Sequence, residues 1–106
     1  MIHHIVQFEW KPETTAAQIE AAAAALLNMP AGIPEIRDIR FGPNLVDENV
    51  PYRHVLVVVC DDMDAVRRYI AHPVHKEVVV THMKPILQSR VAADLDVGSA
   101  PVPSAH

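Results

Sequence analysis

Apolar and polar residues alternate with a period of two in several short stretches of the chain, which is typical of β-strands. In the first stretch His4, Val6 and Phe8 fall on one face, and Glu9 lies on the other. The valine-rich stretch 53–60 is apolar on both faces, as expected for a strand that is covered on both sides. We expect four strands in all, over residues 2–10, 36–41, 53–60 and 89–97.

A spacing of three to four residues between apolar positions marks the first helix. Thr15 and Gln18 have the spacing of a capping box, in which each side chain binds the backbone of the other residue. The apolar positions that follow lie on one face of a helix that we expect to end near Asn28. The polar stretch 42–51 contains two prolines and is expected to be a loop.

The second helical region is interrupted by proline. Asp62 or Asp64 can cap its start, and it runs through Tyr69 to Ala71, where His72 and Pro73 interrupt it. Because proline is favoured in the first turn of a helix, we expect another helical piece from Pro73 to about Val80.

The resulting β-α-β-β-α-β order, with a split βαβ pattern, predicts a ferredoxin-like α+β domain with a four-stranded antiparallel sheet. Both helices would cover one face of the sheet, so the other face stays open although it carries Ile5 and three valines of the stretch 53–60. Such an apolar face is unusual on a soluble monomer, and we expect a homodimer in which two open faces pack together as a dimeric α/β barrel. We assign residues 1–97 to this domain and expect 98–106 to be disordered.

Composition narrows the classes of function. The chain has 106 residues, half of them apolar, and a formal net charge of −4. This charge argues against nucleic acid and against an anionic membrane surface as partners. The longest apolar stretch, 55–60, is far shorter than the roughly 20 residues that span a bilayer. The N-terminal residues lack a signal-peptide pattern, so we expect a cytoplasmic protein. The one cysteine, Cys60, lies in an apolar run and is expected to be buried.

Three separated motifs point to one family. Residues 69–75 read Tyr-Ile-Ala-His-Pro-Val-His, a Tyr-x-x-His-Pro-x-His signature. Residues 2–11 combine a histidine with alternating apolar residues and a lysine, and 84–94 form the matching end. In these motifs the chain resembles the stress-responsive dimeric α/β-barrel (Dabb) domain family and its polyketide-cyclase branch. The resemblance implies the fold predicted above and a pocket between the sheet and the helices.

The resemblance also implies roles for single residues. The tyrosine and the last histidine of the signature are the proposed acid/base pair of the cyclase branch, and here they are Tyr69 and His75. Asp94 could orient His75, as carboxylates do for catalytic histidines, or pair with Arg90 or Arg53. Strand parity together with the resemblance assigns the substrate-binding residues, which are His4, Val6, Phe8, Leu26, His54 and Leu56.

These residue types suit acid/base chemistry without a cofactor. An imidazole in an apolar cavity can take a proton near pH 7, and a phenol can donate a hydrogen bond to a developing enolate oxygen. We therefore expect cyclisation, tautomerisation or elimination of an apolar carbonyl substrate. Plainer interpretations stay open. His75 could satisfy backbone groups at a helix start, and Tyr69 could be a core residue. The protein could also be a non-catalytic stress-responsive or small-ligand-binding dimer.

The seven histidines raise the question of a metal site. His72 and His75 are three residues apart and could share a helix face. However, no HExxH pattern accompanies them, and no carboxylate is clearly placed to complete a site. We predict no metal and no cofactor, and we interpret His72 as an N-cap.

The first helix departs from the cyclase branch. It has Ala22, Ala23 and Leu26 where that branch carries bulky aromatic residues facing the pocket. We therefore expect a cavity of different shape.

Overall fold

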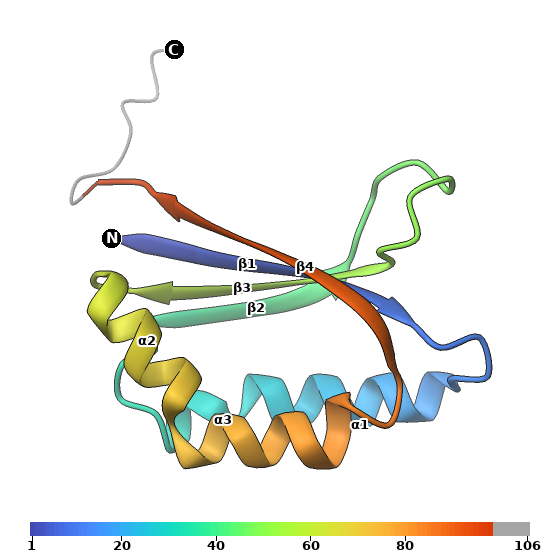
Figure 1. The fold of residues 1–106 in the computed structure, drawn as a ribbon, viewed down its shortest axis with the longest axis horizontal. Coiled ribbons are helices and arrows are strands. Elements are labelled where there is room, and N and C mark those ends of the chain that lie inside the picture. Colours follow the sequence, from blue (N-terminus) through green and yellow to red (C-terminus); the bar gives the residue numbers. More distant parts are fainter. Residues whose placement is uncertain (99–106) are drawn as a thin grey trace.

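The computed structural model describes residues 1–98, with an antiparallel sheet as one layer and the helices as the other (Figure 1). The element order is β1 (Ile2–Trp10), α1 (Ala16–Leu27), β2 (Asp38–Pro43), β3 (His54–Cys60), α2 (Met63–Ala71), α3 (Pro73–Val78) and β4 (Leu87–Asp96). This confirms the predicted α+β order, with the second helical region in two pieces. Apart from Gly98, the tail that we expected to be disordered lies outside the described residues.

Strands β1 and β3 are central in the sheet, whose order is β2-β3-β1-β4. All three pairings are antiparallel. Residues directly opposite each other in such a ladder project from the same face, so the register decides which side chains meet. His4 lies opposite Asp94, and Phe8 lies opposite both His54 and Arg90.

The predicted capping box begins α1. The backbone N–H of Gln18 donates to Thr15 Oγ1 at 3.2 Å, and the N–H of Thr15 donates to Gln18 Oε1 at 2.9 Å. Two of the backbone groups that a helix start leaves unpaired are thus satisfied by side chains.

Helices α2 and α3 are each capped by a side chain. Asp62, rather than Asp64, caps α2 by accepting a hydrogen bond from the N–H of Ala65 at 2.8 Å. His72 ends α2 and caps α3, because its Nδ1 accepts from the N–H of Val74 at 3.1 Å. The interpretation of His72 as an N-cap is confirmed.

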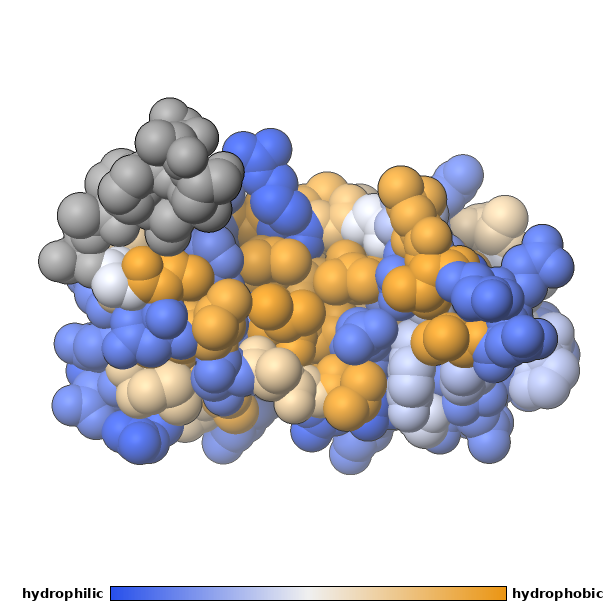
Figure 2. Space-filling model, turned by 90° about the horizontal axis from the view of Figure 1, so that it is seen from above, coloured by the Kyte–Doolittle hydropathy of each residue, from blue (hydrophilic) through white to orange (hydrophobic). Residues whose placement is uncertain are grey.

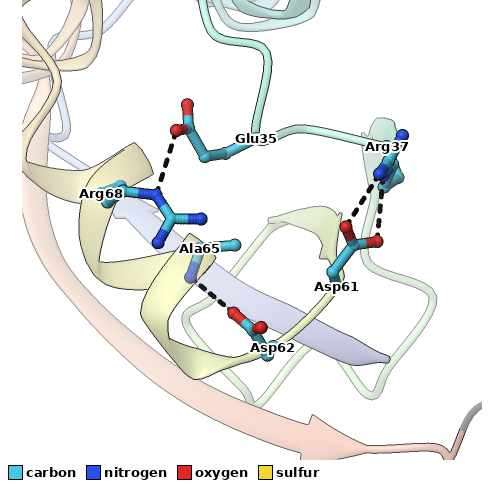
Figure 3. A network of polar contacts seen from close by, with 6 residues as sticks. All are labelled: Glu35, Arg37, Asp61, Asp62, Ala65 and Arg68. Carbon is cyan, nitrogen blue, oxygen red and sulfur yellow. Dashed lines mark hydrogen bonds and ion pairs between the residues drawn. The ribbon is translucent and has the colours of Figure 1, made fainter.

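Two ion pairs tie α2 and the residue before its cap to the segment that precedes β2 (Figure 3). Arg37 donates two hydrogen bonds to the carboxylate of Asp61, at 2.9 and 2.8 Å. Arg68 on α2 donates to Glu35 at 3.2 Å. These contacts link the start and the outer side of α2 to the segment before β2, while the helix itself is held by its buried residues Ala65, Val66 and Tyr69.

The boundaries of two strands differ from the prediction. Strand β2 spans Asp38–Pro43 instead of 36–41, because Ile36 is 7% exposed and packs in the core from a turn. Strand β4 spans Leu87–Asp96 instead of 89–97. Both shifts are set by long-range packing and pairing, which the local sequence does not contain.

Helix α3 does not simply continue to residue 80. It gives way after Val78 to a π-helical turn, Val79–Met83, in which the N–H of Lys84 donates to the carbonyl of Val79 at 2.8 Å. Within residues 1–98, no helix combines the length and the apolar character that a membrane crossing requires.

The core lies between the sheet and the helices. The even positions of β1, from Ile2 to Phe8, are all less than 8% exposed and pack against α1, α2 and the residues that follow them. Cys60 is fully buried there, as expected, and burial together with nearby carboxylates raises its pKa.

The opposite face of the sheet carries no helix, and apolar side chains gather at its centre (Figure 2). We call this surface the open face. The ladder register gives its apolar members as Ile5, Val55, Val57, Val59, Val91, Ala93 and Leu95. Val91 and Leu95 are 42% and 52% exposed. The uncovered apolar face expected from the sequence is therefore present.

Candidate functional site

A cavity of about 170 Å³ lies between the sheet and the helices. Seven of the nine residues that the sequence assigned to the site line it: His4, Val6, Phe8, Leu26, Leu56, Tyr69 and His75. The lining is mostly apolar, with a small number of polar groups, which is the usual character of a small-molecule site.

Tyr69 lies between two histidines in this cavity. Its ring packs edge to face against His75, with centroids 4.9 Å apart, and against His4 on the other side at 5.9 Å. Tyr69 is only 1% exposed, and the three rings form a compact cluster in the wall of the cavity.

The break between α2 and α3 makes this cluster possible. In an unbroken helix, two residues six positions apart would point in directions about 120° apart. Pro73 ends the first helix, and His72 restarts the chain in extended conformation, with φ −65° and ψ 138°. The chain therefore changes direction between Tyr69 and His75 and brings both side chains into one cavity.

Burial shifts the pKa values of Tyr69 and His75 in opposite directions. It raises the pKa of Tyr69 well above 10, so the phenol stays protonated across the neutral range. It lowers the pKa of His75 below 6.5, and the charges of His4 and Arg90 add to this effect while a backbone contact to Ile70 opposes it. At pH 7 the pair thus offers a neutral imidazole and a hydrogen-bond donor.

Asp94 binds His4, which corrects the expectation that it orients His75 or pairs with an arginine. Its carboxylate lies 2.6 Å from His4 Nδ1. Since an ionised carboxylate only accepts hydrogen bonds, Nδ1 of His4 carries a proton and donates it, which leaves Nε2 as an acceptor when the ring is neutral. The reason is the register, because His4 and Asp94 lie directly opposite each other on adjacent strands.

The Nδ1 atom of His75 is buried, and no hydrogen-bond partner for it exists among the described residues. The helix start is capped by His72 instead. The His75 ring does hydrogen-bond to the backbone of Ile70, so the plainer interpretation of His75 as a histidine that satisfies backbone groups stays open. An unpaired buried nitrogen costs free energy, and polar groups of this kind are frequent where a ligand binds.

His54 lies outside the cavity, contrary to the sequence-based expectation. Its Nδ1 accepts a hydrogen bond from Trp10 Nε1 at 2.8 Å, and its ring stacks on Phe41 with centroids 5.4 Å apart. Burial and then Arg53 lower its pKa. Strand parity correctly predicted its face but not its place along the sheet, where it lies four ladder positions, roughly 13 Å, from His4.

Five further lining residues were not predicted: Ile70, Val79, Met83, Leu87 and Arg90. Arg90 is the one cation among them. Its position opposite Phe8 on the adjacent strand could have been inferred only with the register in hand. No cluster of three or more His, Cys, Asp or Glu side chains suited to a metal ion occurs in the part of the chain that the structure describes.

Fold and cavity together define a ferredoxin-like α+β domain with a histidine–tyrosine cluster under its sheet. Residues 2–97 match the sequence model of the stress responsive A/B barrel domain, Dabb. The chain belongs to the Dabb family.

Three known proteins resemble this chain in sequence or in fold. Olivetolic acid cyclase from Cannabis sativa is 28% identical over 76 residues, which are 70% of this chain and 75% of the cyclase. A dimeric ferredoxin-like protein of unknown function from Thermobifida fusca is 34% identical, with a TM-score of 0.76 over 89% of this chain and 88% of that one. Hydroxynitrile lyase from Passiflora edulis is 17% identical, with a TM-score of 0.80 over 95% and 96% of the two chains. The lyase shares the fold, and the cyclase is a sequence relative.

Proposed function

We propose that the protein is a small enzyme that performs acid/base chemistry, without a cofactor, on an apolar carbonyl compound. The observation that carries this proposal is the pairing of Tyr69 with His75 in one largely apolar cavity, at a centroid distance of 4.9 Å. The relationship to olivetolic acid cyclase supports it. The different first helix argues that the substrate itself is not shared.

In the proposed reaction His75 takes a proton from the carbon next to the carbonyl. Its lowered pKa keeps the imidazole neutral at pH 7 and able to accept this proton. Tyr69 remains protonated and donates a hydrogen bond to the enolate oxygen as negative charge develops there. In a tautomerisation the proton returns to the enolate oxygen or to another carbon. In an elimination the bond to a leaving group breaks, and that group takes the proton. In a ring closure the enolate carbon bonds to a second carbonyl carbon of the same substrate, and the oxygen of that carbonyl takes the proton.

We also propose that the working form is a homodimer joined through the open face. An uncovered apolar surface at the centre of a sheet supports this, since burial of such a surface is favourable and its exposure is unusual in a monomer. The Thermobifida fusca relative is described as dimeric.

Proton abstraction can be measured directly as exchange of carbon-bound hydrogen. In deuterated water the protein should accelerate loss of the α-proton NMR signals of 4-phenylbutan-2-one, a simple apolar ketone. We expect His75→Gln to reduce the accelerated rate by roughly 10²–10⁴-fold, and Tyr69→Phe by about 10²–10³-fold.

Tyr52→Phe is the matched control, because Tyr52 is half-buried but does not line the cavity. It should exchange like the wild type. Binding of the ketone without any accelerated exchange would refute the catalytic proposal and favour the alternative, a non-catalytic protein that binds small apolar ligands.

A further inference from the structure

Positively charged side chains line the inner cavity and the surface next to it. A surface groove adjoins the inner cavity, and the two hollows share three wall residues, Ile70, His75 and Val79. Lys76 and Lys84 line the groove. His75 therefore lies where an inner apolar cavity meets an outer basic groove.

Arg90 adds a third cation, at the wall of the inner cavity. Within residues 1–98 it forms no ion pair, and the one carboxylate on its face of β4 near the cavity, Asp94, lies four positions along the strand and pairs with His4. Arg90 and His75 line the same cavity, so a ligand that occupies this cavity can contact both side chains. Such an unpaired, exposed arginine beside an apolar cavity is free to bind an anion.

This arrangement opposes the overall charge of the molecule. The chain has a net charge of −4, yet no aspartate or glutamate lines either hollow, and three cations do. A local reversal of sign at a cleft attracts ligands of opposite charge.

We infer that the substrate carries an acidic group, a carboxylate or a phosphate, which Arg90 binds at the wall of the inner cavity while Lys76 and Lys84 attract it from the groove. This inference rests on the proposed function and specifies its substrate class. The planar guanidinium can donate two parallel hydrogen bonds to either kind of oxyanion. The apolar body of the substrate lies in the inner cavity, whose volume is close to that of a cavity known to hold benzene, about 150 Å³.

The test compares binding of matched probes by calorimetry: 3-phenylpropanoate, its uncharged amide, and 2-phenylethyl phosphate. We expect the wild type to bind the carboxylate roughly ten to a hundred times more tightly than the amide. Arg90→Gln should remove this preference. The affinities of the carboxylate and the phosphate are also compared, both in the wild type and in the double variant Lys76→Gln, Lys84→Gln. The probe that the wild type binds more tightly identifies the oxyanion that the site takes.

Arg67→Gln is the control, since Arg67 is exposed, pairs with Asp64 and lies outside both hollows. It should keep the preference for the carboxylate. Equal binding of carboxylate and amide by the wild type, an unchanged preference in Arg90→Gln, or no binding of any probe would each overturn the inference. None of these outcomes depends on catalysis, so a failure here is distinguishable from a failure of the proton-exchange experiment.

Discussion

At the scale of the residue, the surroundings of each side chain decide its chemistry. His4, His54 and His75 have different partners: a carboxylate, an indole and, for the Nδ1 of His75, none among the described residues. Only His75 combines burial in the cavity with a ring nitrogen that no described group binds. This is why we assign the base to it rather than to the other two.

The lowered pKa of His75 predicts a pH dependence of both activity and stability. The proton-exchange rate should rise with pH, and the midpoint of this rise should lie below 6.5, the ordinary pKa of histidine. The unfolded chain takes up a proton near pH 6.5 while the buried ring resists it, so stability is full above that pH and is lost as the pH falls below it. His75→Gln lacks this group, and its urea-unfolding free energy should therefore decrease less between pH 7.5 and 5.5 than that of the wild type.

His54 has a lowered pKa as well. Because His54 is present in both proteins, its contribution to the pH dependence of the unfolding free energy cancels in the comparison. An equal decrease in the two proteins would contradict the assignment of a depressed pKa to His75.

At the scale of the element, the interrupted helix positions the site. Helix α2 supplies Tyr69, α3 supplies His75, and the π-helical turn Val79–Met83 contributes two further wall residues. Pro73 ends α2 and lies in the first turn of α3. The break costs backbone hydrogen bonds locally, but it allows residues of both helices to line the same cavity.

The cap of α2 gives a prediction at this scale. Asp62→Ala removes the carboxylate that accepts from the N–H of Ala65, and we expect the free energy of unfolding to fall by about 1 kcal/mol. Asp64→Ala is the control, because Asp64 pairs only with Arg67 on the exposed helix surface, where such a pair contributes roughly 0.3–0.5 kcal/mol. Chemical denaturation measures both. Equal losses in the two variants would show that the cap is not the stabilising contact.

At the scale of the whole molecule, the sheet separates two kinds of surface. The face under the helices holds the core and the cavity, and the open face holds the apolar patch (Figures 1 and 2). The site and the proposed dimer interface therefore lie on opposite sides of the same strands. Dimerisation can stabilise the sheet without blocking the cavity from that side.

The interface is tested by placing a charge on it. Val57 lies on β3, at the centre of the open face, and Val57→Asp should convert the dimer into a monomer in sedimentation experiments, because removing a carboxylate from water at an apolar interface costs free energy. Leu45→Asp is the control, since Leu45 is 92% exposed in the loop before β3. A wild-type chain that sediments as a monomer, or a Val57→Asp variant that still forms the dimer, would refute this interface.

The order of the elements follows from local sequence. The capping box at Thr15 and the proline at position 73 act on their immediate neighbours, and the alternation in β1 needs only the geometry of a strand. The same alternation indicated the open face, and the signature at 69–75 indicated which side chains to seek in one cavity.

The partners of Asp94 and His54 depended on tertiary structure. Alternation predicts the face of a strand but not which strand is adjacent or how far it is shifted. The register of β4 against β1 therefore places Asp94 opposite His4 and Arg90 opposite Phe8. Contacts between residues as much as ninety positions apart form only when the whole sheet assembles, and packing of all its strands determines them together.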